Sequence, residues 1–163
     1  MSESIDAFRD HIVRVLDWQE AHVGCDRALD GIPPDKRGAR AVGFEHSPWQ
    51  LLEHMRIAQE DILDFCLNAH YEHSMKWPED YWPTDPAPLS AKAWTDSIAS
   101  YTRSREALKQ LARRVQDLTA KVPIGKDGQT YLRAFLLVAD HTAYHVGQLV
   151  AVRRALGVWT EAS

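Results

Sequence analysis

The sequence of 163 residues lacks most of the features that would assign it at once to a specialised class of protein. Its two cysteines, Cys25 and Cys66, are too few for a disulfide framework and have no CxxC spacing, so we expect a reduced, cytoplasmic protein. No stretch approaches about 18 uninterrupted apolar residues, and the N-terminal segment is charged throughout. Both observations argue against a membrane span and a signal peptide. Basic residues are not in excess, since 19 Lys and Arg stand against 23 Asp and Glu, so a nucleic-acid partner is not expected.

What the sequence does contain is helical periodicity. Apolar residues recur at steps of three and four in four segments, which predict helices over about 4–29, 47–71, 90–120 and 130–156. The second helix has the clearest start, because Ser47-Pro48-Trp49-Gln50 matches an N-cap, a first-turn proline and a reciprocal capping box. The fourth is apolar on more than one side, so we expect it to be the most buried. The pattern predicts an all-α fold, a single four-helix bundle domain over residues 1–163.

Residues 73–89 cannot form one helix, because they contain four of the eight prolines. We expect an extended connection whose aromatic side chains, Trp77, Tyr81 and Trp82, pack back onto the bundle. At ~3.3 Å per residue it could span ~55 Å, which exceeds the length of a helix of about 25 residues at ~1.5 Å per residue. This connection is therefore long enough to cross the whole bundle and to leave the second and third helices parallel.

The third helix carries core residues at seven-residue steps and basic residues on the opposite side. The core series is Trp94, Tyr101, Leu108, Val115 and Val122. The basic residues are Arg103, Arg105, Lys109, Arg113 and Arg114. Since acidic residues share this helix, we interpret the basic set as a solvated face and not as a binding patch.

The sequence has eight histidines, and their placement is more informative than their number. His141 and His145 are spaced i, i+4, so both imidazoles project from one face of the most apolar helix. This spacing recurs in metal sites because two such nitrogens can converge on one ion at ~2.0–2.1 Å. The alternative is that each ring forms a hydrogen bond with a neighbouring side chain or a water. Spacing alone leaves both interpretations open.

A third ligand would favour the metal, and His54 is the candidate, because it lies at the border of the apolar stripe of the second helix. From there its side chain can point between helices, or it can be a half-buried polar residue. The other five histidines are interpreted as ordinary polar residues. His11 and His22 are too far apart along one helix to share an ion. His46 lies in a loop and is expected to be solvent-exposed, and His70 and His73 form a surface pair.

Two segments together resemble the DinB/YfiT-like family of small metal-binding helical bundles. One is Ser47-Pro48-Trp49-Gln50-Leu51-Leu52-Glu53-His54, and the other is His141-x3-His145-Val146-Gly147-Gln148-Leu149 followed by Arg153-Arg154 and Gly157. The resemblance covers essentially the whole chain. It implies a four-helix bundle with an unusual crossover between the second and third helices, and frequently a homodimer. It also implies a divalent metal ion held by three histidines, which correspond to His54, His141 and His145, with Gln148 able to line the pocket.

Three hypotheses for function follow from an ion with an open coordination position. In the first, the site activates a low-molecular-weight thiol cosubstrate for S-transfer to an electrophile, as the resemblance implies. In the second, the protein is a metal-dependent hydrolase; Glu53 and Asp61 are the candidate bases, although neither is well placed. In the third, it is a non-catalytic, stress-associated dimer that binds metal or a small ligand. Zinc and nickel are the leading ions, with iron, manganese and copper as alternatives. No catalytic side chain is assigned.

Overall fold

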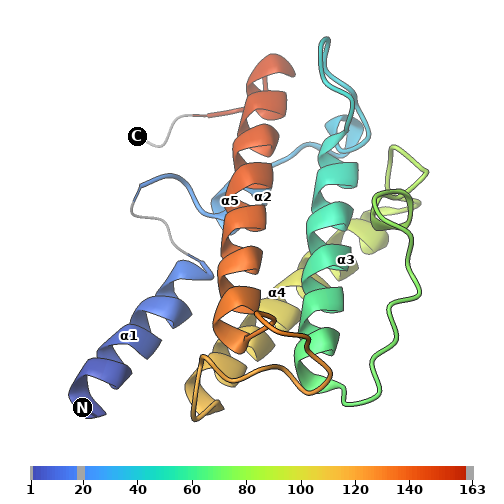
Figure 1. The fold of residues 1–163 in the computed structure, drawn as a ribbon. Coiled ribbons are helices and arrows are strands. Elements are labelled where there is room, and N and C mark those ends of the chain that lie inside the picture. Colours follow the sequence, from blue (N-terminus) through green and yellow to red (C-terminus); the bar gives the residue numbers. More distant parts are fainter. Residues whose placement is uncertain (1, 18–20, 161–163) are drawn as a thin grey trace.

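The computed structural model describes residues 2–17 and 21–160, and in this part of the chain every regular element is a helix. Four long helices pack together: α1 (Ser2–Val15), α3 (Pro48–Leu67), α4 (Ala91–Arg114) and α5 (Tyr131–Ala155) (Figure 1). Three short elements join them, namely α2 (Cys25–Leu29) and the 3-10 turns η1 (Pro34–Lys36) and η2 (Glu79–Tyr81). The predicted all-α bundle is confirmed. None of the described helices has the length and hydropathy that crossing a membrane would require.

The capping residues identified in the sequence define where the helices begin. The Ser47 Oγ atom accepts a hydrogen bond from the Gln50 backbone N–H at 3.2 Å, and the Gln50 Oε1 atom accepts one from the Ser47 N–H at 3.3 Å. This is the reciprocal capping box, which satisfies two amide groups that the first turn leaves unpaired. Ser90 and Thr130 cap α4 and α5 with their hydroxyl oxygens, which accept hydrogen bonds from the backbone N–H groups of Ala93 and Arg133.

The first predicted helix, 4–29, is wrong as one element, because α1 ends at Val15 and α2 begins only at Cys25. Gly24 precedes α2 in an extended conformation, and glycine is a poor residue for continuing a helix. The break allows α2 to bury three of its five residues and to bring Asp26 to the Arg105 guanidinium of α4, at 2.9–3.0 Å. Residues 18–20, which the prediction also included, lie outside the described residues.

Two other predicted helix ends differ from the structure. α3 stops at Leu67 instead of 71, and α4 stops at Arg114 instead of 120. At the end of α4, the Arg9 guanidinium donates hydrogen bonds to the carbonyl groups of Ala112 and Val115, at 2.5 Å each. These bonds satisfy carbonyl groups that a longer helix would have used internally. The series of core residues at seven-residue steps therefore predicted the burial of Val122 correctly, since Val122 is 2% exposed. Val122 lies beyond the end of α4, so the series did not predict helix correctly at that position.

α3 and α4 run parallel, as the length of the connection between them allowed. Polar side chains link Glu53 to Ser97 and Glu60 to Ser100, so residue numbers rise together along both helices. α5 runs in the opposite direction beside α3 (Figure 1). The segment between Leu67 and Ala91 must therefore return along the outside of the bundle, and we call it the crossover.

Side chains along one face of α3 bind the crossover through hydrogen bonds. Ser47 donates to the Pro86 carbonyl, and the Gln50 amide donates to the Pro83 carbonyl at 3.1 Å. Further along, Asp61 accepts a bond from the Tyr81 hydroxyl at 2.6 Å. The predicted packing of the aromatic residues is correct for Tyr81, which is buried, and for Trp82, which packs on the core; Trp77 is largely exposed.

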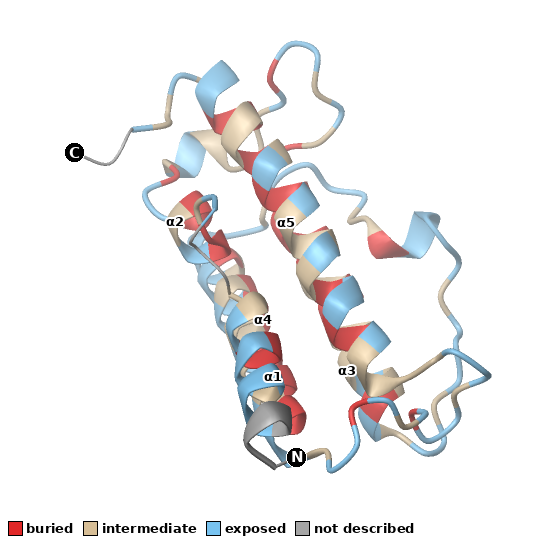
Figure 2. Cartoon of the chain, turned by 60° about the vertical axis from the view of Figure 1, so that its left-hand side comes forward, coloured by how far each residue is buried: buried red, intermediate tan, exposed pale blue. Residues whose placement is uncertain are grey.

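Two expectations about burial are wrong. α5 is not the most buried helix, because its outer face exposes Leu136, Leu137 and Tyr144, whereas α3 lies between α4, α5 and the crossover (Figure 2). Arg105 does not belong to a solvated face: it is buried, pairs with Asp26 and lies over the Tyr101 ring. A guanidinium can be buried there because Asp26 supplies the opposite charge.

Candidate metal centre

Three histidines meet between α3 and α5. His54 comes from α3, and His141 and His145 come from adjacent turns of α5. The ligand nitrogens of the three rings all lie within 4.8 Å of one another, and the Nε2 atoms of His54 and His141 are 3.0 Å apart. In the described part of the chain this is the one group of three or more metal-ligating side chains that is so close. The i, i+4 pair and the third histidine on the other helix are thus brought together.

The crossover sets the orientation of the His54 ring. The His54 Nδ1 atom lies 2.9 Å from the Tyr81 carbonyl oxygen. Because a carbonyl oxygen only accepts, we assign the proton to Nδ1, which leaves the Nε2 lone pair directed at His141. The ring also stacks on Trp82, with centroids 3.8 Å apart and planes inclined by 1°. His54 is only 1% exposed, so these two contacts leave the ring little freedom.

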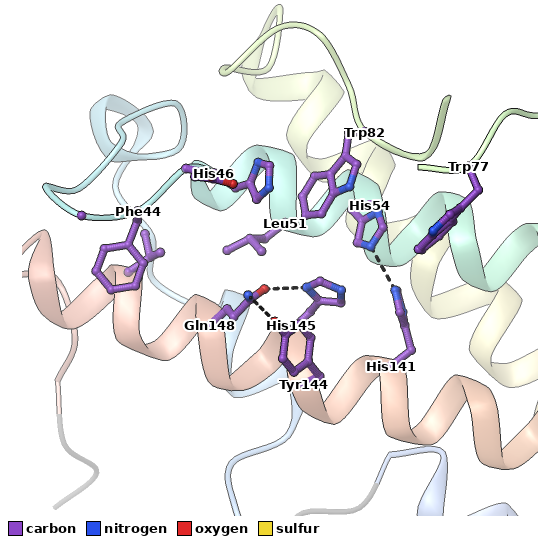
Figure 3. A pocket seen from close by; sticks show the side chains of 13 residues that line it. Phe44, His46, Leu51, His54, Trp77, Trp82, His141, Tyr144, His145 and Gln148 are labelled. Atoms are coloured by element: carbon purple, nitrogen blue, oxygen red, sulfur yellow. Dashed lines mark hydrogen bonds between the residues drawn. The ribbon is translucent and has the colours of Figure 1, made fainter. Parts of the chain in front are cut away.

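Gln148 orients the His145 ring, as the Tyr81 carbonyl orients the His54 ring. Its Oε1 atom lies 2.7 Å from the Nδ1 atom of His145, and its amide nitrogen donates to the Tyr144 hydroxyl at 3.2 Å. With the amide nitrogen donating to Tyr144, we assign Oε1 as the acceptor of the proton on His145 Nδ1. Nε2 of His145 is then the free, metal-facing nitrogen, as in many histidine-metal sites. Figure 3 shows these contacts around the three rings.

Burial keeps these imidazoles neutral near pH 7. It lowers the pKa of His54 to about 4, and it lowers the pKa of His141 to about 3 with a further contribution from the neighbouring histidines. Burial also lowers the pKa of His145, against the opposing effect of its bond to Gln148. The neutral ring is the form that binds metal, so no proton has to leave a cationic imidazole at neutral pH. The donor set therefore fits a divalent ion.

The three rings open onto a cavity of about 550 Å³. Four stretches of the chain form its walls: the loop before α3, α3 itself, the crossover and one face of α5 (Figure 3). The lining residues are Gly43, Phe44, Glu45, His46, Leu51, His54, Trp77, Trp82, His141, Tyr144, His145, Gln148 and Val152. A site with three protein ligands beside such a cavity has room for a fourth ligand from solution.

His46 is not the solvent-exposed loop residue that we expected. It is half-buried, it stacks on the free face of Trp82 with centroids 3.7 Å apart, and it lines the cavity. His46, Trp82 and His54 thus form a continuous stack. The sequence offered one signal for this position, because His46 directly precedes the N-cap of α3, at the end of the helix nearest to His54. Nothing in the sequence indicated that Trp82 would fold back between the two histidines.

The two acidic residues considered as bases are engaged elsewhere. Glu53 accepts two hydrogen bonds from Arg56 at 2.8 Å and another from Ser97 of α4. Asp61 accepts from the hydroxyl groups of Tyr71 and Tyr81. Neither carboxylate lines the cavity.

The remaining reactive side chains also lie outside the cavity. Burial raises the pKa of both Cys25 and Cys66 to about 12, so neither supplies a thiolate at neutral pH. The His73 ring bonds to the Tyr71 hydroxyl at 2.9 Å, and the His22 ring bonds to the carbonyl of Val23 at 2.8 Å. The protein itself therefore presents no activated cysteine to a bound substrate.

A comparison with protein families gives one match. The DinB superfamily matches residues 17–149, a range that contains the three histidines, α3, α4 and the crossover. No curated protein matches the chain.

Proposed function

The chain belongs to the DinB superfamily, and from this membership we propose that His54, His141 and His145 hold one divalent metal ion. The convergence of three imidazoles supports this proposal most directly. In two of them the hydrogen-bond acceptors, the Tyr81 carbonyl and Gln148, favour the proton on Nδ1 and leave Nε2 for the metal. Zinc and nickel are the ions that we favour, while iron, manganese and copper also suit imidazole ligands.

We further infer that the protein is a thiol S-transferase. A divalent ion with three imidazole ligands and an open position would hold a thiol cosubstrate as its thiolate near neutral pH. In the transfer, the thiol proton passes to solvent, and the sulfur donates an electron pair to an electrophilic carbon. The leaving group departs with the bonding pair, and the product is a thioether. This reaction needs no nucleophile from the chain, which agrees with the burial of Cys25 and Cys66.

Side chains around the cavity have supporting roles in this proposal. Gln148 and the Tyr81 carbonyl orient two of the ligand rings, and Trp82 holds the His54 ring by stacking. The cavity walls place a second substrate beside the histidines and reduce its contact with water. We expect the protein to be a homodimer in solution, because it belongs to the DinB superfamily.

Hydrolysis is the second candidate, and one observation favours it. Glu45 is a carboxylate that lines the cavity and could act as a base for water. Its side chain is exposed to solvent. Because Glu53 and Asp61 are held by other side chains, we favour thiol transfer over hydrolysis.

Metal content tests the site first. The purified wild-type chain is expected to bind one equivalent of zinc or nickel by elemental analysis, and His145→Ala is expected to lose it. His70→Ala, an exposed histidine outside the cluster, is the matched control and should retain the metal. If the wild type remains metal-free after incubation with zinc and with nickel, the site proposal is wrong.

The metal-loaded chain is then offered a panel of low-molecular-weight thiols together with an electrophile. We expect loss of free thiol that requires the metal. Cleavage of esters or amides without thiol consumption would support the hydrolase instead. If neither reaction occurs, the third function remains, a metal-binding or ligand-binding dimer without turnover. Light scattering tests the dimer in each case.

A further inference from the structure

Two large aromatic side chains beside the histidines are unusually exposed. Trp77 of the crossover is 63% exposed, and Tyr144 of α5 is 64% exposed, yet both line the cavity. Folding normally covers such rings, because a buried aromatic ring contributes a large apolar area to the core. The centroid of the Trp77 ring lies 6.2 Å from that of His54, so the ring lies beside the candidate ligands although most of its surface is exposed. These two side chains present apolar surface that a bound molecule could cover.

The other walls are also apolar. Phe44, Leu51 and Val152 are further apolar residues of the cavity lining. Trp82 is not available for a ligand to stack on, because His46 and His54 already occupy its two faces. Stacking on a bound molecule is therefore left to Phe44, Trp77 and Tyr144. A molecule that fills this space needs a flat aromatic or apolar body.

The chain itself supplies no cationic side chain to this cavity. Of the thirteen described residues that line it, Glu45 alone carries a fixed charge, and no lysine or arginine is among them. The Arg40 guanidinium lies 3.4 Å from the Gln50 Oε1 atom and is not part of the cavity lining. In the metal-free chain, a carboxylate or phosphate that entered the cavity would lose water without meeting a cationic side chain, and the lining already carries the carboxylate of Glu45.

We propose that this cavity binds a molecule with an uncharged, flat aromatic or apolar body, which packs against Trp77 and Tyr144 while its reacting end faces the three histidines. Its role as the electrophile of the transfer rests on the proposed function. Its binding does not, because the walls that hold it belong to the chain and are present without a metal.

Three probes that share one body and differ in charge test the proposal on the metal-free full-length chain. They are naphthalene-2-carboxamide, naphthalene-2-carboxylate and 2-naphthylmethylammonium, each titrated by calorimetry. We expect the carboxamide to bind about tenfold more tightly than the carboxylate, because only the carboxylate carries an unpaired charge into the cavity. A carboxylate that binds as tightly as the carboxamide would overturn the argument from charge.

Substitutions locate the binding surface. Trp77→Ala and Tyr144→Ala should each weaken carboxamide binding about fivefold or more, whereas Phe8→Ala, which removes a 47% exposed ring on α1, should leave it unchanged. Glu45→Lys should tighten carboxylate binding about threefold and leave carboxamide binding unaffected, as expected for an exposed charge. Unchanged carboxamide affinity in both aromatic variants, with the fold intact by circular dichroism, would overturn the proposed surface.

Metal content measured on the same samples separates this proposal from the proposed function. A chain that binds the carboxamide through Trp77 but takes up no metal would refute the metal centre and support the cavity. A chain that takes up one metal ion but binds no naphthalene probe would refute the cavity and leave the metal centre standing.

Discussion

The orientation of His145 by Gln148 leads to a quantitative prediction for Gln148→Leu. The substitution keeps the size of the side chain but removes the Oε1 atom, which lies 2.7 Å from Nδ1 of His145. His145 is 5% exposed, so water can replace this acceptor only in part. The ring then loses both the acceptor that fixes its proton on Nδ1 and the bond that makes Nε2 a better donor. We expect zinc affinity to fall about 10- to 100-fold, or about 1.4–2.8 kcal/mol.

Competition with a chromophoric zinc chelator at pH 7.5 measures this loss. Gln148→Glu is the matched control, because it retains an oxygen acceptor at the same reach and should bind zinc at least as tightly as the wild type. Tyr144→Phe provides a smaller perturbation. It removes only the partner of the Gln148 amide, which lies 3.2 Å away, so its effect should stay below about threefold.

The fold must be checked independently, by thermal unfolding of the metal-free proteins. If Gln148→Leu is folded and its zinc affinity lies within about twofold of the wild type, then Gln148 does not set the His145 tautomer. The assignment of Nε2 as the metal-facing nitrogen would then be wrong for this ring.

Local chemistry explains why much of the fold could be predicted. The capping box at Ser47 and the prolines of residues 73–89 act within a few residues, so their consequences can be read from the sequence. The length of the crossover allowed the parallel arrangement of α3 and α4 but did not require it. The break between α1 and α2 could not be predicted, because the contact between Arg105 and Asp26 that accompanies it joins residues 79 positions apart.

In the candidate site, too, the local features could be predicted from the sequence, and the features that depend on distant parts of the chain could not. The helical spacing of His141 and His145 placed both rings on one face. The position of His54 at the border of an apolar stripe made it the candidate third ligand, and the family resemblance then paired it with them. What completes the site is the Tyr81 carbonyl, which fixes the His54 ring. A backbone carbonyl has no side-chain signature, and its position depends on how the whole crossover returns along α3. His46 was misjudged for the same reason, since its partner Trp82 also arrives with the crossover.

Two further predictions concern the packing that holds this arrangement. Burial acts to raise the pKa of Glu53, but its hydrogen bonds to Arg56 and Ser97, together with the charge of Arg56, outweigh that effect and hold the pKa below the ordinary value of 4.5. Its contribution is therefore present at neutral pH and lost as the pH falls through the lowered pKa. Glu53→Gln should cost about 1–3 kcal/mol in urea unfolding at pH 7 and much less near pH 3, and an equal cost at both would contradict this. Gly38→Ala would place a methyl group 2.4 Å from the Cβ atom of Ala87 in the crossover, so we expect a loss of about 1–3 kcal/mol. Gly147→Ala on α5 is the matched control: its added Cβ meets nothing within 4 Å, and a helical alanine should stabilise by up to ~1 kcal/mol. Opposite signs for the two glycines are the expected result, and an unchanged unfolding free energy for Gly38→Ala would show that the crossover does not pack tightly there.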